Sequence, residues 1–291
     1  MRITVITLRR NGAAASMRKA GWLGIGALVF LLGAGVAFAD DPPARVARLS
    51  VLAGEVSYAA AGQQSWSAIG INRPLIAGDR LLTGDDSRVE LQLGGASVRL
   101  ASNTASSFLA LDEQIAQIEL SQGTLNLDVR TLDDGQSYEV DTPTVALVVR
   151  TAGEYRIDIN GDNSTTVSVF SGAVTVYGSN DSQYALTGRQ SYRFGDAALT
   201  DVVGQPLPAP DAFDDWCFAR DDAERGAATQ TYVSPDIVGA SDLDAYGQWR
   251  DVDDYGYVWF PSAVAAGWAP YRYGHWVWIA PWGWTWIDDA P

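Results

Sequence analysis

The chain has 291 residues, of which 47% are hydrophobic and 19% charged, and its formal net charge is −15. All of the acidic residues lie at or after Asp40, so that part of the chain carries a charge of about −20, which disfavours nucleic acid and anionic lipid as partners. Cys217 is the single cysteine and His275 the single histidine, which excludes an intrachain disulfide and gives very weak support to Ser-His-Asp, Cys-His or zinc chemistry.

The first predicted element is an export signal. A short basic region at Arg18 and Lys19 precedes an apolar run and the small-residue cleavage pattern Ala37-Phe38-Ala39. We therefore expect residues 1–39 to be a signal peptide that is cleaved after Ala39, leaving a periplasmic or secreted protein. The alternative is an uncleaved anchor, since this segment offers the ~20 apolar residues of a membrane span. Membrane contact would then occur only through this segment.

Short alternating strands are predicted between residues 45 and 200. Residues 88–93, for example, alternate polar and apolar side chains before a glycine pair, and Asn160-Gly161 predicts a hairpin because both residues tolerate positive φ. Asp158 begins a 1-3-5 acidic pattern resembling a calcium loop, but Val169 occupies the position of the required glutamate, so no metal is expected. Strands at this spacing without intervening helices predict an all-β domain, which can be a sandwich, a barrel or a solenoid.

Residues 201–245 are predicted to be a proline-rich linker with short helices. After Pro210, Asp211 can cap a helix that places Phe213, Trp216 and Cys217 on one face. Arg220 and Arg225 suit the negative end of that helix.

Residues 246–291 contain a tryptophan-rich repeat. Eight of the eleven tryptophans lie between Trp249 and Trp286, and the aromatic and glycine positions from Tyr246 to Trp259 recur 27 positions later. Self-similarity at a fixed period indicates a duplicated unit. Each copy is predicted to be a β-hairpin, with its turn at Asp253-Asp254 or at Ala280-Pro281.

The tryptophans of the second copy alternate along the chain and so fall on one face of an extended segment. That face can be packed or left open for a ligand. Eight tryptophans hold on the order of 1,500 Å², as much as a standard protein interface buries, and so small a unit needs most of its rings for folding. We expect a minority of exposed rings. The candidate ligand or partner contacts are Trp276, Trp278, Trp282, Trp284 and Trp286.

No combination of residues predicts catalysis. His275 corresponds to Gln248 in the other copy of the repeat, which argues against a catalytic base, and no carboxylate pair stands out as a glycosidase site. We expect a protein without enzymatic activity, cofactor or metal.

Several motifs between residues 45 and 200 resemble the FecR domain, a periplasmic sensing domain named from iron-dicitrate regulation. They are Gly78-Asp79-Arg80-Leu81-Leu82-Thr83-Gly84, Val140-Asp141-Thr142-Pro143, Val149-Arg150-Thr151-Ala152-Gly153-Glu154-Tyr155, Ser171-Gly172-Ala173-Val174-Thr175-Val176 and Leu186-Thr187-Gly188-Arg189-Gln190. The resemblance implies an all-β, FecR-like stack of short antiparallel strands, sandwich-like or solenoid-like, without cofactor or catalytic residues.

The regulators of that family carry a cytoplasmic helical domain before their membrane span. Here only residues 1–19 precede the apolar stretch, so no sigma factor is expected as a partner. The tail, especially residues 268–276, is similar to an uncharacterised tryptophan-rich domain that follows FecR domains in proteobacterial exported proteins. That family usually continues past an Asp-Asp-Ala-Pro-like segment, so this chain can be a fragment of a longer protein.

These observations predict an exported, non-catalytic envelope protein that binds or scaffolds through an aromatic surface. Its partner would be an envelope protein or a cell-wall glycan. Two alternatives remain open, namely a glycan-binding or cell-wall-binding module and a sensor or regulatory component that acts on a membrane partner.

Overall fold

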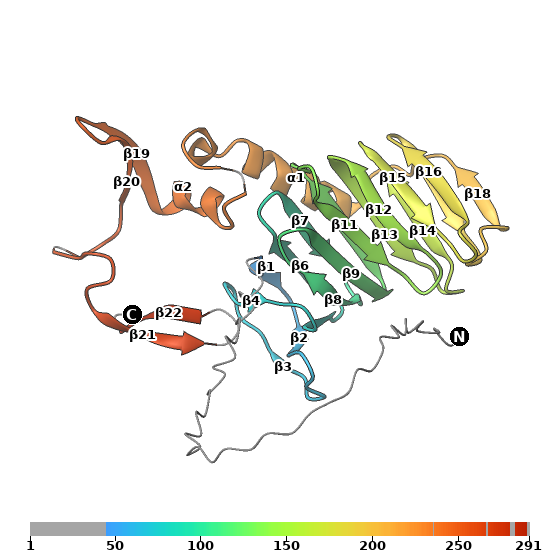
Figure 1. Ribbon diagram of the computed structural model, residues 1–291, viewed down its shortest axis with the longest axis horizontal. Helices are drawn as coiled ribbons and strands as arrows, with labels where there is room; N and C mark the ends of the chain where they lie inside the picture. Colours follow the sequence, from blue (N-terminus) through green and yellow to red (C-terminus); the bar gives the residue numbers. More distant parts are fainter. Residues whose placement is uncertain (1–44, 235, 266, 280–282, 290–291) are drawn as a thin grey trace, which may run out of the picture. The chain divides into compact units, whose positions relative to one another are not determined.

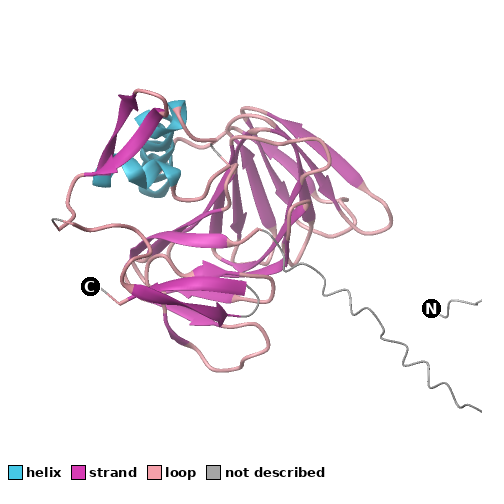
Figure 2. Ribbon diagram, turned by 60° about the vertical axis from the view of Figure 1, so that its left-hand side comes forward, coloured by secondary structure: helices cyan, strands magenta, loops and turns pink. Residues whose placement is uncertain are grey.

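The computed structural model describes residues 45–234, 236–265, 267–279 and 283–289. The expected signal peptide and its helix lie outside these residues. Within the described part of the chain, no helix has the length and apolar character needed to cross a membrane. The chain is mainly β, as predicted, and its strands from Ala47 to Gln205 form two nine-stranded sheets (Figures 1 and 2).

The two sheets, here named sheet A and sheet B, both follow the order of the sequence. Sheet A consists of β4 (Pro74–Leu75), β1 (Ala47–Ala53), β6 (Arg88–Gln92), β7 (Ala96–Leu100), β10 (Thr124–Val129), β13 (Gly153–Ile159), β14 (Thr165–Val169), β17 (Gln190–Phe194) and β18 (Val202–Gln205). Sheet B consists of β3 (Ser67–Ala68), β2 (Val56–Ala59), β5 (Arg80–Thr83), β8 (Ala105–Leu111), β9 (Ile115–Gln122), β11 (Ser137–Asp141), β12 (Ala146–Thr151), β15 (Ala173–Tyr177) and β16 (Gln183–Thr187).

The chain crosses repeatedly between the sheets while it advances along both of them, as the colour gradient in Figure 1 shows. Described neighbours pair antiparallel except β9 and β11, which are parallel. The architecture therefore combines the two layers of a sandwich with the steady advance of a solenoid. Alternation along the strands could not choose between these forms, because it reports only which face of a strand is apolar.

One hydrophobic core lies between the sheets and extends from Ala47 to Phe194. In β10, Leu125, Leu127 and Val129 point into this core. The alternate residues Asn126 and Asp128 face away from it and are nevertheless buried. The middle of sheet A is therefore covered on both faces.

The Asn160-Gly161 hairpin is confirmed, but its turn differs from the predicted one. Strands β13 and β14 pair antiparallel, and the backbone N–H of Asn160 donates to the carbonyl of Ser164 at 2.9 Å. The left-handed residue of this longer turn is Asn163, with φ of 62°. Asparagine at this position satisfies the turn because its short polar side chain tolerates positive φ.

The tail forms two β-hairpins, as predicted. Strands β19 (Gly247–Val252) and β20 (Gly256–Pro261) make the first, and β21 (Gly274–Ile279) and β22 (Gly283–Asp288) the second. Every boundary of the second hairpin lies 27 residues after its counterpart. The cross-strand pair Trp249–Trp259 likewise recurs as Trp276–Trp286.

The first predicted turn is present at Asp253-Asp254, where the N–H of Tyr255 donates to the carbonyl of Val252 at 3.0 Å. Asp254 has a left-handed φ of 70° there. The other predicted turn, at Ala280-Pro281, lies outside the described residues.

A glycine at the start of each hairpin explains part of the repeat. A Cβ at Gly247 would lie 2.4 Å from Cε2 of Trp259, and one at Gly274 would lie 2.5 Å from Cζ2 of Trp286. Each tryptophan ring therefore lies over a backbone position that only glycine leaves open.

We expect Gly247→Ala to lower the free energy of unfolding by about 1–3 kcal/mol, because the added methyl group overpacks the Trp259 ring. Urea unfolding followed by tryptophan fluorescence measures the change. Gly161→Ala is the matched control, since a Cβ there meets no heavy atom within 4 Å. Equal effects of the two substitutions would contradict the steric role of Gly247.

Candidate functional site

An exposed aromatic face lies on the second hairpin, formed by Trp276, Trp278, Trp284 and Trp286. The cross-strand rings meet edge to face, with centroids 5.5 Å apart for Trp276 and Trp286 and 5.8 Å apart for Trp278 and Trp284. Trp276, Trp278 and Trp284 are 52%, 62% and 66% exposed, whereas Trp286 is half-buried. The fifth predicted contact, Trp282, lies outside the described residues.

The corresponding tryptophans of the first hairpin are covered by the preceding part of the chain. The indole N–H of Trp249 donates to Oγ1 of Thr229 at 3.0 Å, and that of Trp259 donates to the carbonyl of Leu243 at 3.1 Å. The ring of Tyr232 lies 4.9 Å from that of Trp249. The covering residues belong to or border the short helices η1 (Ala228–Thr231), η2 (Ala240–Asp242) and α2 (Leu243–Tyr246).

The two hairpins thus share one register but have different surroundings. The first hairpin has Arg250 and Asp251 where the second has Val277 and Trp278. The second copy has therefore lost two charges and gained an indole. His275 lies at its border, with Nδ1 3.2 Å from a carboxylate oxygen of Asp289, and both side chains are exposed.

A second polar region lies where helix α1 (Ala212–Arg225) covers the outer face of sheet A. Asp211 caps the helix as predicted and accepts from the N–H groups of Phe213 and Asp214. The expected apolar face is wrong, however, because only Cys217 of that face is fully buried. The buried residues of the helix are Asp214, Cys217, Asp221 and Glu224.

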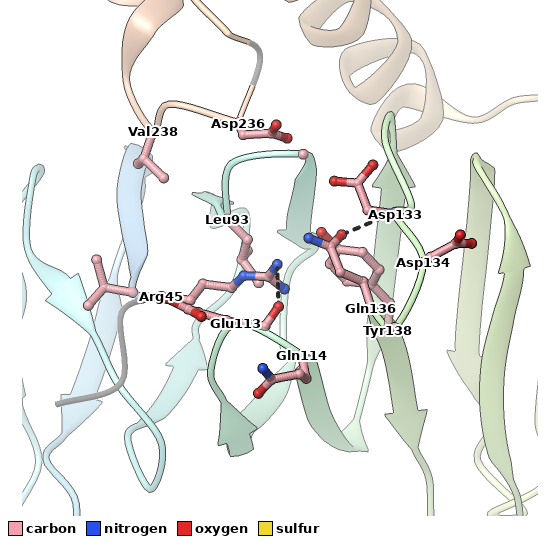
Figure 3. A pocket seen from close by; sticks show the side chains of 13 residues that line it. Arg45, Leu93, Glu113, Gln114, Asp133, Asp134, Gln136, Tyr138, Asp236 and Val238 are labelled. Carbon is pink, nitrogen blue, oxygen red and sulfur yellow. Dashed lines mark hydrogen bonds between the residues drawn. The ribbon is translucent and has the colours of Figure 1, made fainter. Parts of the chain in front are cut away.

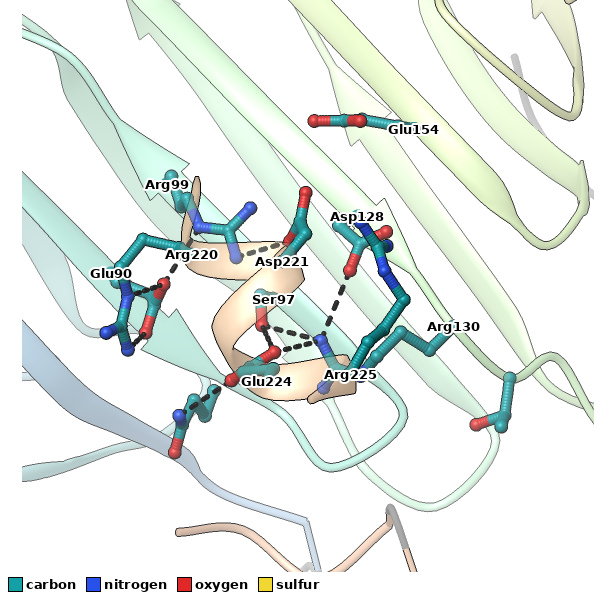
Figure 4. A network of polar contacts seen from close by, with 12 residues as sticks. Glu90, Ser97, Arg99, Asp128, Arg130, Glu154, Arg220, Asp221, Glu224 and Arg225 are labelled. Carbon is teal, nitrogen blue, oxygen red and sulfur yellow. Dashed lines mark hydrogen bonds and ion pairs between the residues drawn. The ribbon is translucent and has the colours of Figure 1, made fainter. Parts of the chain in front are cut away.

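The buried acids of α1 meet arginines of sheet A (Figure 4). Arg99 is fully buried and donates to Asp221 at 2.6 Å and to Glu90 at 2.9 Å. Arg220 of the helix also donates to Glu90, at 2.8 Å. Burial alone would raise the pKa of Glu90, but the two arginines lower that pKa to about 2.

Arg130 makes the second ionic contact with the helix. Its Nη1 donates to Glu224 at 2.6 Å, to Ser97 at 2.9 Å and to Asp128 at 3.3 Å. Ligand oxygens of Asp128, Asp221 and Glu224 all lie within 4.8 Å of one another. Because the Arg130 guanidinium already provides a cation between two of these carboxylates, we assign no metal to the group.

Sequence reasoning missed this region. The outward residues of β6, β7 and β10 are polar, as on a solvated strand face, and the acids of α1 resemble a solvated helix face. The available signal was the regular spacing of Asp214, Cys217, Asp221 and Glu224, which brings these residues onto one side of a helix.

A separate cavity of about 780 Å³ lies beside Arg45 and Tyr138 (Figure 3). The guanidinium of Arg45 lies 5.6 Å from the ring centroid of Tyr138, and its Nη2 donates to the carbonyl of Glu113. Acidic residues, including Asp133 and Asp236, line the cavity as well. This mixture defines no single class of ligand.

Two sequence families match separate parts of the chain. Residues 79–175 match the FecR protein family, and residues 240–291 match a family of unknown function, DUF6600. The chain thus contains a FecR domain followed by a domain of an uncharacterised family, which confirms both resemblances.

None of the curated proteins matches this chain in sequence. Two crystal structures of a Parabacteroides distasonis protein assigned as an anti-sigma factor are similar to it. The structure at 1.65 Å resolution is 18% identical with a TM-score of 0.39, and the match covers 45% of this chain and 60% of that one. The structure at 2.50 Å resolution is 16% identical with a TM-score of 0.40, and the match covers 63% and 99% of the two chains. The chain therefore spans three fifths of the length of the first of these structures.

Proposed function

We propose that this FecR-domain protein is a non-catalytic regulatory component of the cell envelope that binds a partner protein through the aromatic face of its second hairpin. The FecR domain supports the regulatory and envelope parts, because that family is regulatory and not catalytic. The observation that carries the binding part is the exposure of Trp276, Trp278 and Trp284 on one hairpin face.

A protein partner is favoured by what covers the first hairpin. There the equivalent tryptophan, Trp249, is covered by a tyrosine ring and a threonine hydroxyl of the same polypeptide. A polypeptide turn is therefore a demonstrated occupant of this kind of face. Aromatic enrichment with few charges is also typical of the central part of protein interfaces.

Glycan binding has less support. Sugar recognition needs polar groups placed around the stacking rings. Among the described residues, the face itself consists of four indole side chains, and the rings of Trp278 and Trp284 are inclined by 82° instead of lying in one plane.

We expect the double substitution Trp278→Ala/Trp284→Ala to weaken partner binding by at least about tenfold, because exposed tryptophans at the centre of an interface contribute roughly 2 kcal/mol each. The free energy of unfolding should change by no more than about 0.5 kcal/mol, since neither ring is buried. A photo-crosslinking amino acid at position 278 of the intact protein, in cells, identifies the partner, and titration with that purified partner gives the affinity.

Tyr255→Ala is the matched control, because Tyr255 is an exposed aromatic residue of the first hairpin. It should leave binding unchanged. Tryptophan-dependent binding to purified cell-wall glycan, without a protein adduct at position 278, would replace the protein partner by a glycan. Unchanged binding by the double variant would reject the aromatic face as the contact surface.

A further inference from the structure

Two carboxylates face each other across the contact between sheet A and α1 without a donor of their own. Asp128 lies on β10 and Asp221 lies in the middle of α1, and both are buried. Oδ1 of Asp221 accepts from Arg99 at 2.6 Å, but its buried Oδ2 has no hydrogen-bond partner among the described residues. An unsatisfied buried acceptor costs about 1–3 kcal/mol, and a second anion beside it adds repulsion.

The surrounding charges leave this pair underneutralised. The charged and titratable groups facing it are Arg99 from β7, Glu90 from β6, Arg130 after β10, Glu154 from β13, and Cys217, Arg220, Glu224 and Arg225 from α1. Arg99 is shared with Glu90, and Arg130 is shared with Glu224. Neither arginine is therefore available to Asp128 and Asp221 alone.

We propose that α1 is a proton-dependent clasp, in which Asp128 and Asp221 share one proton while the helix lies on sheet A, and loss of that proton loosens the helix. The proton donates from one carboxyl group to an oxygen of the other, which satisfies the free acceptor and removes one negative charge. Since α1 joins the last strand of the stack to the segment that holds the hairpins, the clasp would control that connection. It is independent of the aromatic face.

The electrostatics of the buried acids agree with this arrangement. Burial and the charge of Asp221 raise the pKa of Asp128 to about 6. Burial raises the pKa of Glu154 to about 8, with the charges of Asp221 and Asp128 adding to it against a hydrogen bond from Asn126.

Because both pKa values are higher in the docked state than in a solvated acid, docking is strongest below the ordinary carboxyl pKa of about 4. It weakens as the pH rises through about 6 and about 8. Glu90 acts in the opposite direction, since its lowered pKa of about 2 makes its ion pairs fail only in strong acid.

Cys217 offers a reporter inside the intact protein. It is the only cysteine, it is fully buried on the same face of α1, and burial raises the pKa of its thiol. We expect its labelling by a maleimide, divided by the labelling rate of the urea-unfolded protein at the same pH, to rise at least about tenfold between about pH 5 and about pH 8.

Asp128→Asn should stay protected at about pH 8, because its amide N–H can donate to Asp221 at any pH. Asp222→Asn, an exposed acid of the same helix, should keep the wild-type profile. If Asp128→Asn fails to fold, Asp221→Asn tests the same pair from the helix side, and hydrogen exchange of the α1 amides gives a second readout.

A pH-independent normalised rate in the wild-type protein would overturn the proposal. So would an Asp128→Asn variant with the wild-type pH profile. Protection that depends on added calcium or magnesium and not on pH would assign the pair to a bound cation and would also overturn it.

Discussion

Replacing Arg99 by methionine is expected to lower the free energy of unfolding at neutral pH by roughly 3–5 kcal/mol, because the change leaves buried carboxylates without their cation. Asp221 would lose its 2.6 Å ion pair, and Glu90 would keep only Arg220. Methionine fills much of the arginine volume, so the loss reports charge more than packing. Urea unfolding of the intact protein measures the effect.

Arg225→Met is the matched control. Its ion pair with Asp222 joins side chains that are 55% and 81% exposed, so the expected change is within about 0.5 kcal/mol. Adding Asp221→Asn to Arg99→Met should recover part of the loss, because it removes one of the stranded charges. A loss below about 1 kcal/mol for Arg99→Met would mean that water enters the α1 interface and that its ion pairs contribute little.

The second large effect is expected at Asp79, in the Gly-Asp motif of the FecR domain. Its buried carboxylate accepts from the N–H of Ala61 at 2.9 Å, the N–H of Ile76 at 3.0 Å and the hydroxyl of Tyr58 at 3.0 Å. Asp79→Ala leaves three donors without this acceptor. We expect a loss of roughly 3–5 kcal/mol, measured by thermal or urea unfolding.

Asp112→Ala provides the comparison for Asp79. Asp112 also accepts from two backbone N–H groups, at 2.8 Å each, but near the surface, where water can replace it. Its removal should cost about 1 kcal/mol. Asp79→Asn, which keeps one acceptor oxygen, should fall between the two alanine variants, and equal losses for Asp79→Ala and Asp112→Ala would contradict the role of burial.

Local patterns carried much of the fold. Alternation of apolar residues predicted the strands because side chains of an extended chain point to opposite faces. The repeat at 27 residues predicted two hairpins, and Gly247 and Gly274 show why the same letters recur, since each leaves room for a tryptophan ring. The capping residue Asp211 marked the start of α1 because its side chain binds the N–H groups of the first turn.

Other features depended on contacts between distant parts of the chain. Trp249 and Trp276 occupy equivalent positions, yet one is covered by Tyr232 and the other is open, which no local pattern distinguishes. Likewise, Asp128 and Asp221 are ordinary polar positions of a strand and a helix until the two elements pack together. Their neighbours and burial, and with them their protonation, are set only when α1 docks, because desolvation and charge pairing depend on what lies opposite in space.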